Sequence, residues 1–442
     1  MNIYALSSGR GPSGIAIVRV SGKGTLKVCK NLTKLKEINS NEVNYCQFYD
    51  PKNNSVIDPE ALLLWFPGPN SYTGEDLAEF QVHGSNAVIN ALLMALSEQE
   101  NCRLAEPGEF TKLAFQNDKI DLLKAESIGD LIHAETEMQR QQAVKLVQGN
   151  ASNYYNDLRE KLIKSLAYIE AKIDFAEDDL PEKVLKEVHN SIKEIHKDIH
   201  KIIEDNKIGE KIRDGFKISI TGEVNAGKSS LLNLIAKRDV AIVSDEAGTT
   251  RDVIESYLNI DGYPVILSDT AGIRDAKNEV EKKGISLALG KSKEADLNIV
   301  VIDNSSKNIN NEIKKMINKD TIVLLNKSDI QNKQSLKFDA DTVLASVKEN
   351  KNIDSLIKKI QEKLSKKFMS NNTALITRER HRVKLNQCLK EIDNFLKKDQ
   401  NKDLELAAED LRMATRHLGS IVGKVDVEEI LGSIFKDFCI GK

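Results

Sequence analysis

The sequence of 442 residues has few cysteines, few aromatic residues and no long apolar run. The five cysteines are widely separated, at Cys29, Cys46, Cys102, Cys388 and Cys439. Their odd number and spacing argue against a disulfide framework and against a cysteine-rich zinc site. Aromatic residues make up 5% and charged residues 30% of the chain, which favours a helix-rich protein over a β-sandwich. No uncharged apolar run approaches the ~20 residues that span a bilayer.

An excess of charge of one sign is also missing, since 64 Lys and Arg residues oppose 67 Asp and Glu residues, for a net charge of −3. A nucleic acid would therefore be bound by a local basic patch and not by a global cationic field. Residues 1–10 lack the basic start and the long apolar stretch of a signal peptide. We therefore expect a cytoplasmic protein that does not contact membranes.

Glycine and proline clusters divide the chain into zones. In residues 1–118, short apolar segments such as 14–22 and 61–68 lie between Gly, Pro and Asn clusters, which predicts a mixed α/β N-terminal domain. From 119 to 212 a helical periodicity takes over, and Pro181 would mark the start of one helix. The apolar positions of that helix are Leu185, Val188, Ile192, Ile195, Ile199 and Ile202. Their spacing is typical of a helix that packs against another helix.

A third zone, residues 213–371, alternates strand-like apolar runs with helical patterns. The runs are 216–221, 265–268, 297–302, 321–325 and 342–346. Strands separated by helices in this way predict a parallel, doubly wound sheet. Residues 372–442 are helical again. We therefore expect an α/β multidomain protein in which the α/β unit is inserted into a discontinuous helical domain, made of 119–212 and 372–442.

The segment GEVNAGKS, residues 222–229, matches the phosphate-loop pattern G-x-x-x-x-G-K-S. It follows a predicted strand and precedes a predicted helix, the context in which backbone amides wrap phosphate oxygens. Lys228 would place its charge at the β- and γ-phosphates, and Ser229 would ligate Mg²⁺.

Three further segments follow in the order that a GTPase requires. In DTAG, Asp269 can hold the Mg²⁺ shell and the amide of Gly272 can meet the γ-phosphate. In NKSD, residues 326–329, the Asp329 carboxylate can accept hydrogen bonds from the ring NH and the exocyclic amine of guanine, a pair that adenine lacks. Residues 346–348, SVK, can complete the base pocket. The four motifs together predict a GTP-binding domain.

The group that positions the attacking water is not evident from the motifs. Ras-type enzymes use a glutamine directly after the DTAG segment, whereas Ile273 stands there in this chain. Spacing identifies no arginine finger, so another group must neutralise the charge of the transition state. The carboxylates just downstream, Asp275, Glu279 and Glu281, remain alternatives for the water.

A monovalent cation is the candidate for charge compensation. The amide oxygen of Asn225 in the phosphate loop could ligate such an ion. Residues 244–252, SDEAGTTRD, could supply backbone carbonyls to it, and Thr250 could complete the Mg²⁺ shell.

The motifs N-x-G-K-S at 225–229 and A-G-T-T-R-D at 247–252 resemble those of the bacterial GTPases of the Era, EngA and MnmE superfamily. Further stretches narrow the resemblance to the MnmE (TrmE) family of tRNA modification GTPases: SYTGED (71–76), RLAEPGEFTKLAF (103–115), NDKIDLLKAES (117–127) and the terminal CIGK. The likeness covers essentially the whole chain and falls in three separate zones. It implies a tetrahydrofolate-binding and dimerisation domain over 1–118 and a GTPase domain over 213–371.

The resemblance implies a set of ion and catalytic residues. K⁺ would be held by Asn225, Ser244, Glu246 and Thr249, in the place of an arginine finger, and would stimulate hydrolysis across a dimer. Mg²⁺ would be held by Ser229 and Thr250. Glu281 matches the catalytic glutamate of the family, and Lys228 acts with it. The residues expected to contact GTP are Asn225, Ala226, Gly227, Lys228, Ser229, Ser230, Ser244, Asp245, Glu246, Ala247, Gly248, Thr249, Thr250, Asp269, Thr270, Ala271, Gly272, Asn326, Lys327, Asp329, Ser346, Val347 and Lys348.

The resemblance also implies that the N-terminal domain takes a 5-formyl- or 5,10-methylene-tetrahydrofolate. The matching positions are Arg19, Glu79, Lys119 and Lys442. A carboxylate such as Glu79 can accept paired hydrogen bonds from a pterin, and cationic side chains suit the glutamate tail of a folate. Cys439 is either a catalytic thiol near this site or a structural one.

By the same resemblance, the protein would work with an FAD-dependent partner of the MnmG (GidA) kind, as a homodimer within a heterotetramer. The pair would modify C5 of the wobble uridine, position 34, of tRNAs to an aminomethyl or carboxymethylaminomethyl derivative.

Two alternatives stay open. One is an Era/EngA-like ribosome-assembly GTPase without modification chemistry, which would carry an RNA-binding module after its GTPase domain; 372–442 has no GXXG loop. The other is a membrane-tethering GTPase, for which no basic amphipathic helix is evident. The histidines His189, His196 and His200 share a helical stripe, but their Lys and Glu neighbours favour a solvated face over a metal site.

Overall fold

A computed structural model of the chain describes residues 1–9, 11–174, 182–223, 225–237, 255–269, 290, 293–306, 309–330, 338–368, 374–398, 403–425, 431, 434–435, 438 and 440–441. The chain divides into two compact units. The first consists of Met1–Gly129, Leu146–Leu166 and Leu411–Lys442, and the second of Asp130–Lys145 and Ala167–Asp410. The three-part division expected from the sequence remains a prediction.

The first unit contains a six-stranded sheet with the order β3-β4-β5-β2-β1-β6. Its strands are β1 Asn2–Leu6, β2 Ser13–Ser21, β3 Val43–Tyr49, β4 Val56–Phe66, β5 Leu77–Gly84 and β6 Cys102–Leu104. Neighbouring strands run antiparallel, apart from β1 and β6, which are parallel. The strand-like runs at 14–22 and 61–68 lie in β2 and β4, so the mixed α/β prediction for this region is confirmed.

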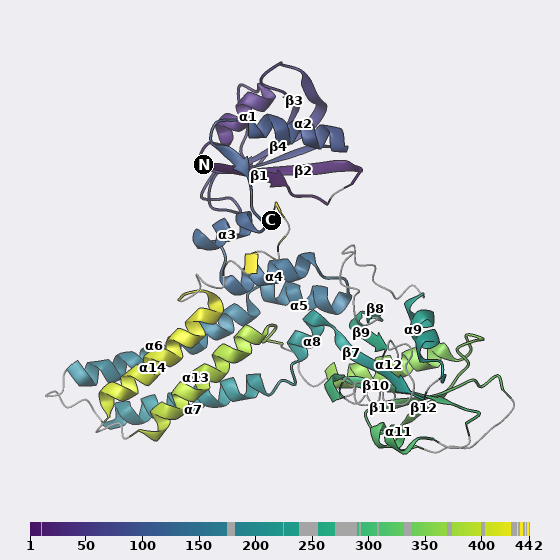
Figure 1. The fold of residues 1–442 in the computed structure, drawn as a ribbon. Helices are drawn as coiled ribbons and strands as arrows, with labels where there is room; N and C mark the ends of the chain where they lie inside the picture. Colours follow the sequence, from purple (N-terminus) through teal and green to yellow (C-terminus); the bar gives the residue numbers. More distant parts are fainter. Residues whose placement is uncertain are drawn as a thin grey trace, which may run out of the picture. The chain divides into compact units, whose positions relative to one another are not determined.

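Helices α1 (Thr25–Thr33) and α2 (Asn86–Ser97) pack on this sheet through one core (Figure 1). Successive side chains of a strand point to opposite faces. In β5, Phe80 therefore belongs to the core under the helices, whereas Glu79 belongs to the other face. Helix α2 begins directly after Ser85, whose hydroxyl accepts a hydrogen bond from the amide of Val88, as an N-cap does.

The other helices that supply residues to the first unit are α3 Glu109–Gln116, α4 Leu122–Ile132, α5 Glu137–Val147, α6 Asn150–Asp174 and α14 Leu404–Val422. Near the end of the chain, Phe435 and Phe438 form a small core with Ala125 of α4. Gly108, at φ 66°, lies close to this tail: a Cβ there would come within 2.6 Å of the carbonyl oxygen of Phe435. The described part of the tail is thus packed against the N-terminal half of the first unit.

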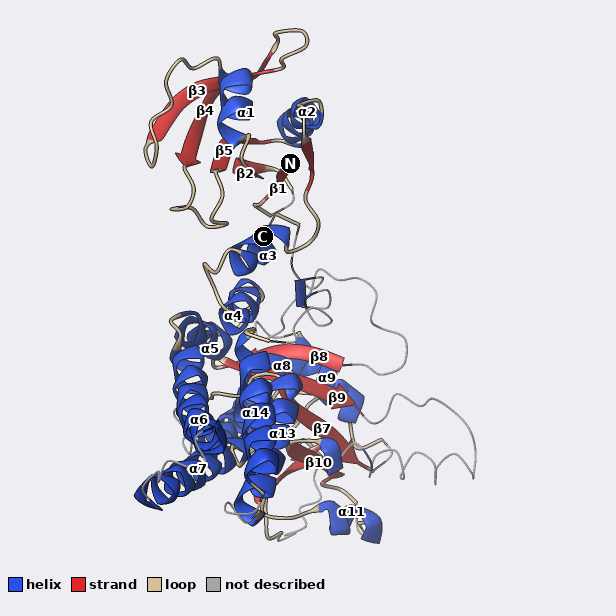
Figure 2. Cartoon of the chain, turned by 90° about the vertical axis from the view of Figure 1, so that its left-hand side faces the viewer, coloured by secondary structure: helices blue, strands red, loops and turns tan. Residues whose placement is uncertain are grey.

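The second unit contains a six-stranded sheet with the order β12-β11-β10-β7-β9-β8; its strands β8, β9, β7 and β10 follow one another in Figure 2. Its strands are β7 Phe216–Gly222, β8 Glu255–Ile260, β9 Tyr263–Asp269, β10 Leu297–Asp303, β11 Thr321–Asn326 and β12 Asp341–Leu344. All neighbours are parallel except β8, which pairs antiparallel with β9. The parallel sheet is confirmed. The edge strand β8 was not predicted, although Asp261-Gly262, both at positive φ, is a typical hairpin turn.

Both faces of this sheet are buried. Ile299 and Ile322 belong to a core that includes residues of α8 (Ile208–Asp214), α9 (Lys228–Ala236) and α12 (Ile353–Phe368). Val300 and Val323, one residue further along the same strands, belong to a second core with Met316 of α11 (Asn311–Met316). Burial on both faces explains the nearly continuous apolar runs in these strands.

Helices α7 (Glu182–Ile203) and α13 (Glu379–Lys397) pack side by side in the second unit. Five of the six predicted apolar positions of α7 are buried: Val188, Ile192, Ile195, Ile199 and Ile202. The sixth, Leu185 near the start of the helix, is half-buried. Pro181 lies outside the described residues. In the described part of the chain, no helix has the length and apolarity needed to cross a bilayer.

Candidate nucleotide-binding site

Four of the parallel strands direct their carboxyl ends to one edge of the second sheet. Strands β7, β10, β11 and β12 pair in parallel register, and each is followed by a polar segment. In open α/β sheets, ligands bind at this edge. The edge therefore gathers the segments that follow Gly222, Asp303, Asn326 and Leu344.

The phosphate loop joins β7 to α9 and depends on two glycines. A Cβ on Gly222 (φ 141°) would lie 2.0 Å from the carbonyl oxygen of Val301 in β10. A Cβ on Gly227 (φ 101°), which caps α9, would lie 2.4 Å from the amide nitrogen of the Asn326 side chain. Neither position tolerates another residue, since both the space and the backbone conformation require glycine. The loop can therefore lie close against the sheet edge.

The first turn of α9 suits an anion. It carries no acidic residue, and the unpaired amides of a helix N-terminus attract phosphate. The ammonium of Lys228 donates to the carbonyl oxygens of Glu223 (2.7 Å) and Gly222 (3.1 Å), so it lies over the loop. Ser229 and Ser230, next in the helix, are exposed. This arrangement places a cation and hydroxyls at one end of a phosphate cradle.

Asn326 joins the phosphate loop to the segments predicted to bind the base. Its side chain is buried, donates to the carbonyl oxygen of Ala226 (2.7 Å) and accepts from the amide of Val347 (2.9 Å). Because both of its polar atoms are engaged, Asn326 fixes the distance between the phosphate loop and the β12 loop. Asn326 therefore ties the phosphate loop to the β12 loop.

The carboxylate of Asp329, which is predicted to bind the base, is held in place by a hydrogen bond. Ser346, itself buried, donates its hydroxyl to Asp329 Oδ1 at 2.6 Å. This hydrogen bond, with the charges of Lys348 and Lys327, keeps the pKa of Asp329 below its usual range. Asp329 is exposed and ionised at neutral pH, as an acceptor for two guanine N–H groups must be.

Sequence reasoning missed two carboxylates beside the site, Glu223 and Asp303. Asp303 Oδ2 accepts from the ammonium of Lys327 at 2.6 Å. Burial raises the pKa of Asp303, but hydrogen bonds from Lys327 and Ser305 outweigh this effect and leave the pKa below the usual value. Asp303 could have been suspected from its position at the end of a strand, next to the strand that carries NKSD.

Several predicted residues lie outside the described part of the chain. They are Ser244, Asp245, Glu246, Ala247, Gly248, Thr249, Thr250, Thr270, Ala271, Gly272, Glu281, Cys439 and Lys442. The backbone of Asp269 is described as the last residue of β9, opposite Ile220 of β7. The structure thus brings together the phosphate-loop and base segments.

A second cluster of predicted residues lies in the first unit. Arg19 of β2 and Glu79 of β5 are opposite each other in the register, and two guanidinium nitrogens donate to Glu79 Oε1 at 2.6 and 3.1 Å. The guanidinium also lies over the rings of Tyr72 and Phe110, at 5.5 and 5.7 Å from the ring centroids. Burial raises the pKa of Tyr72. Lys119 is exposed.

The described end of the chain reaches the same cluster. The carbonyl oxygen of Gly441 accepts from Ser7 Oγ (2.8 Å) and from Arg19 (3.4 Å), and Ile440 bridges to Pro107. A Cβ on Gly441 would lie 2.2 Å from the carbonyl oxygen of Leu6. The end of the chain therefore contacts Arg19 of the Arg19–Glu79 pair.

Comparison with known proteins identifies the family. Residues 2–119 match the family described as GTP-binding protein TrmE N-terminus, and residues 122–439 match the MnmE helical domain. The chain belongs to the MnmE family. It is 58% identical over 444 residues to the tRNA modification GTPase MnmE of Pelagibacter ubique (strain HTCC1062), with 100% of both chains covered. It is 44% identical to the MnmE of Rickettsia bellii (strain RML369-C), over 100% of this chain and 99% of the relative.

A solved structure of a variant of Aquifex aeolicus Era bound to GDP.AlF4- is 26% identical, over 40% of this chain and 66% of that chain, with a TM-score of 0.27. So low a TM-score supports no further conclusion. Membership of the MnmE family rests on the two family matches and on the full-length relatives.

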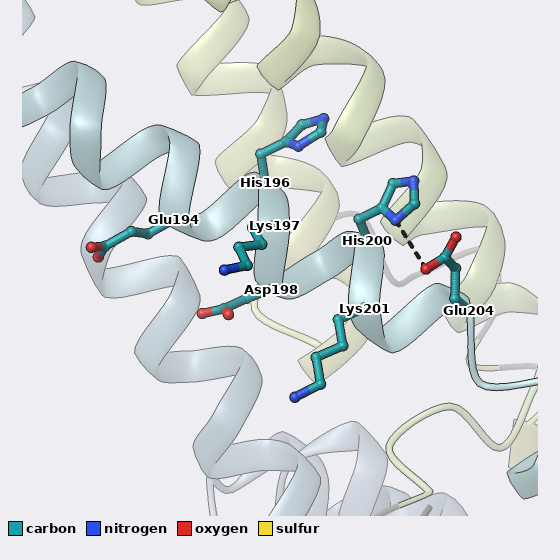
Figure 3. A pocket seen from close by; sticks show the side chains of 7 residues that line it. All are labelled: Glu194, His196, Lys197, Asp198, His200, Lys201 and Glu204. Atoms are coloured by element: carbon teal, nitrogen blue, oxygen red, sulfur yellow. Dashed lines mark ion pairs between the residues drawn. The ribbon is translucent and has the colours of Figure 1, made fainter. Parts of the chain in front are cut away.

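The histidine stripe of this MnmE-family chain lies on α7, beside a surface hollow of about 680 Å³ (Figure 3). His196 Nε2 lies 3.0 Å from Asp393 Oδ1 of α13, and His200 Nδ1 lies 3.4 Å from Glu204 Oε2. Among the described residues, no group of three or more His, Cys, Asp or Glu side chains could hold a metal ion. The two histidines instead serve as partners of carboxylates.

Proposed function

We propose that this protein is a GTP hydrolase that acts in tRNA modification. The observation that carries the proposal is the hydrogen-bonded frame of the site. Asn326 links the phosphate loop to the β12 loop, and Ser346 holds the carboxylate of Asp329. A fixed carboxylate at that place discriminates guanine from adenine, since adenine would leave it unpaired. The full-length MnmE relatives, named tRNA modification GTPases, support the same function.

The residues present at the site fit a nucleoside triphosphate. Gly222 and Gly227 let the loop lie close against β10 and the Asn326 side chain, and the amides at the start of α9 would bind phosphate oxygens. Lys228 would exchange its contacts with loop carbonyls for the β- and γ-phosphates. We propose that the other predicted residues also contact GTP. They are 225–230, 244–250, Asp269–Gly272 and 346–348.

Two metal ions belong to the proposal. Ser229, exposed in the first turn of α9, is suited to Mg²⁺, a hard cation that prefers oxygen ligands and phosphates. Asn225, exposed at φ 61°, would hold K⁺ with Ser244, Glu246 and Thr249. A bound K⁺ would supply the positive charge that stabilises the transition state, and Glu281 would position water. Hydrolysis is then stimulated by K⁺ and not by Na⁺.

The N-terminal sheet is proposed to hold a 5-formyl- or 5,10-methylene-tetrahydrofolate. Arg19 and Glu79, with Lys119 and Lys442, would bind it, and the contact of Gly441 with Arg19 supports a site near the end of the chain. The folate supplies the one-carbon unit. With an FAD-dependent partner of the MnmG kind, the protein would modify C5 of the wobble uridine of tRNAs in the cytoplasm, as a homodimer within a heterotetramer.

One reconstitution tests this function against ribosome assembly. Unmodified tRNA is incubated with the protein, the FAD-loaded partner, GTP, Mg²⁺, K⁺, methylene-tetrahydrofolate as the carbon donor and ammonium or a primary amine as the nitrogen donor, and its nucleosides are analysed by mass spectrometry. We expect a modified uridine at position 34 that depends on GTP. GTP hydrolysis without any new nucleoside, together with binding to ribosomal subunits, would instead favour an Era-like role.

A further inference from the structure

Glu223 is an unexpected residue for a phosphate loop. It follows Gly222 directly, so it adds negative charge next to amides suited to an anion. Its carboxylate is held by two donors from beyond β10: Oε1 accepts from the amide of Asn310 at 3.1 Å, and Oε2 accepts from the hydroxyl of Ser306 at 3.4 Å. The phosphate loop is therefore tied through Glu223 to the segment that follows β10.

That segment begins with a compact turn, Asp303–Ser306, here called the bridging turn. The amide of Ser306 donates to the carbonyl oxygen of Asp303 at 3.0 Å. Asp303 Oδ1 accepts from both the hydroxyl (2.6 Å) and the amide (2.9 Å) of Ser305. Three hydrogen bonds within four residues fix the shape of the turn, so a displacement at one end is passed to the other.

The opposite end of the bridging turn contacts the NKSD segment twice. Asp303 Oδ2 accepts from the ammonium of Lys327 at 2.6 Å. The amide of Asn304, a residue only 4% exposed, donates to the carbonyl oxygen of Asn326 at 2.9 Å. The turn thus connects the phosphate loop, through Glu223, with the base segment, through Lys327 and Asn326.

We propose that the bridging turn couples the phosphate and base halves of the nucleotide site, and that Glu223 and Asp303 are positioning residues that slow nucleotide release. The inference rests on the proposed function, because it presumes that guanine nucleotides bind here. Neither carboxylate needs to contact the nucleotide. The bridging turn adds to the direct link that Asn326 makes between the phosphate loop and the β12 loop, so one half opens less readily without the other, and release of GDP is slower.

The test is a double-mutant cycle on the full-length protein, with the release of a fluorescent GDP analogue followed by stopped flow. We expect Glu223→Ala and Asp303→Ala each to speed release about 10-fold, the effect of losing charge-assisted hydrogen bonds. Asp303→Ala removes the contacts with Lys327 and Ser305 that hold the turn, and Glu223→Ala removes the contacts at its other end. Because both variants interrupt the same series of contacts, the double variant should release the analogue about as fast as each single variant. A double variant that is about 100-fold faster, the product of the two effects, would overturn the coupling.

Further variants distinguish the loss of the Glu223 hydrogen bonds, here called the tether, from a loss of charge or of folding. In Glu223→Gln the side chain keeps an oxygen acceptor, and the hydroxyl of Ser306 can turn to accept from the new amide, so release should stay within about 3-fold of the unaltered protein. Release as fast as in Glu223→Ala would overturn the tether. Asp303→Asn replaces Asp303→Ala in the cycle if the alanine variant does not fold. Glu294→Ala, at an exposed glutamate, should leave release unchanged.

The outcomes distinguish a failure of the proposed coupling from a failure of the proposed GTPase function. If the unaltered protein binds no GDP analogue, the proposed function fails. If it binds the analogue tightly but the single variants release it at the normal rate, or the double variant multiplies their effects, only the coupling fails.

Discussion

The two candidate sites of this protein are assembled in different ways. At the nucleotide site, each segment follows the end of a parallel strand. The sheet therefore brings residues 222–223, 225–229, 303–306, 326–329 and 346–348 to one edge. At the Arg19 site, antiparallel register places Arg19 opposite Glu79, and the tail adds a carbonyl oxygen from Gly441.

This difference determines how much of each site is complete before a ligand arrives. In the nucleotide site, Asn326 joins the phosphate loop to the β12 loop, and Ser346 joins the β12 loop to Asp329. In the Arg19 site, the two charged groups bond to each other at 2.6 Å, so a ligand that uses Glu79 must share it with Arg19 or displace it. In its described segments the first site is thus already joined by hydrogen bonds, whereas a ligand that uses Glu79 in the second requires an exchange of partners.

The largest effect is expected for Gly222→Ala in the phosphate loop, which should lower the stability of the second unit. The added Cβ would meet the Val301 carbonyl oxygen at 2.0 Å, at a φ of 141°, so β7 and β10 must separate. Overpacking and backbone strain together should lower the stability of the second unit by about 3 kcal/mol. Urea unfolding measures this loss. Gly14→Ala in β2, where a Cβ meets nothing within 4 Å, is the matched control and should change stability by less than about 0.5 kcal/mol.

The next largest effect is expected at Asp329, in the segment predicted to bind the base, and concerns the affinity for GDP. Asp329→Asn keeps the shape of the side chain but replaces one acceptor with a donor, so a guanine N–H would face an N–H. We expect the affinity for GDP to fall on the order of 100-fold, measured by calorimetry. Asp320→Asn, an exposed aspartate in the same unit, should bind GDP normally. Unchanged GDP affinity in Asp329→Asn would show that another group reads the base.

The sequence could predict that the phosphate-loop and NKSD segments meet at one edge of the sheet, because these motifs are local. GEVNAGKS and NKSD each lie within eight residues, and the alternation of strands and helices brings their positions to one edge. Lys228, Asn326 and Asp329 could therefore be assigned to a common site without knowledge of the register. The parallel sheet follows from the same alternation.

Contacts between distant segments could not be predicted in this way. The pairing of Arg19 with Glu79 depends on strand register over 60 positions, which no local pattern specifies. The carboxylates Glu223 and Asp303 were missed because their partners, Asn310 and Lys327, come from other loops. Only the resemblance to a family pointed to the N-terminal site.

A smaller effect tests whether Glu79 serves a ligand or only its arginine. The pair is largely buried, with 15% and 20% of the side chains exposed, so Glu79→Gln should destabilise the first unit by about 1 kcal/mol. If Glu79 also binds the pterin, the affinity for 5-formyl-tetrahydrofolate should fall about 10-fold, measured by calorimetry. Glu60→Gln, on the exposed part of β4, is the control. Normal folate affinity in Glu79→Gln would limit Glu79 to holding Arg19.

The smallest effect concerns pH and the bridging turn. The pKa of Asp303 is lower in the folded protein than its ordinary value, because hydrogen bonds from Lys327 and Ser305 outweigh the effect of burial. A carboxyl with a lowered folded pKa stabilises the fold fully above its unfolded pKa, about 3.9, and this stabilisation is lost as the pH falls through the folded pKa. Asp303→Asn should therefore lower the stability of the second unit at pH 7 and reduce its loss on acidification below about pH 4. Urea unfolding at a series of pH values measures both. An unchanged pH profile would mean that the Asp303–Lys327 contact does not stabilise the unit, and would reduce the link between the bridging turn and the base segment to the hydrogen bond from the Asn304 amide to Asn326.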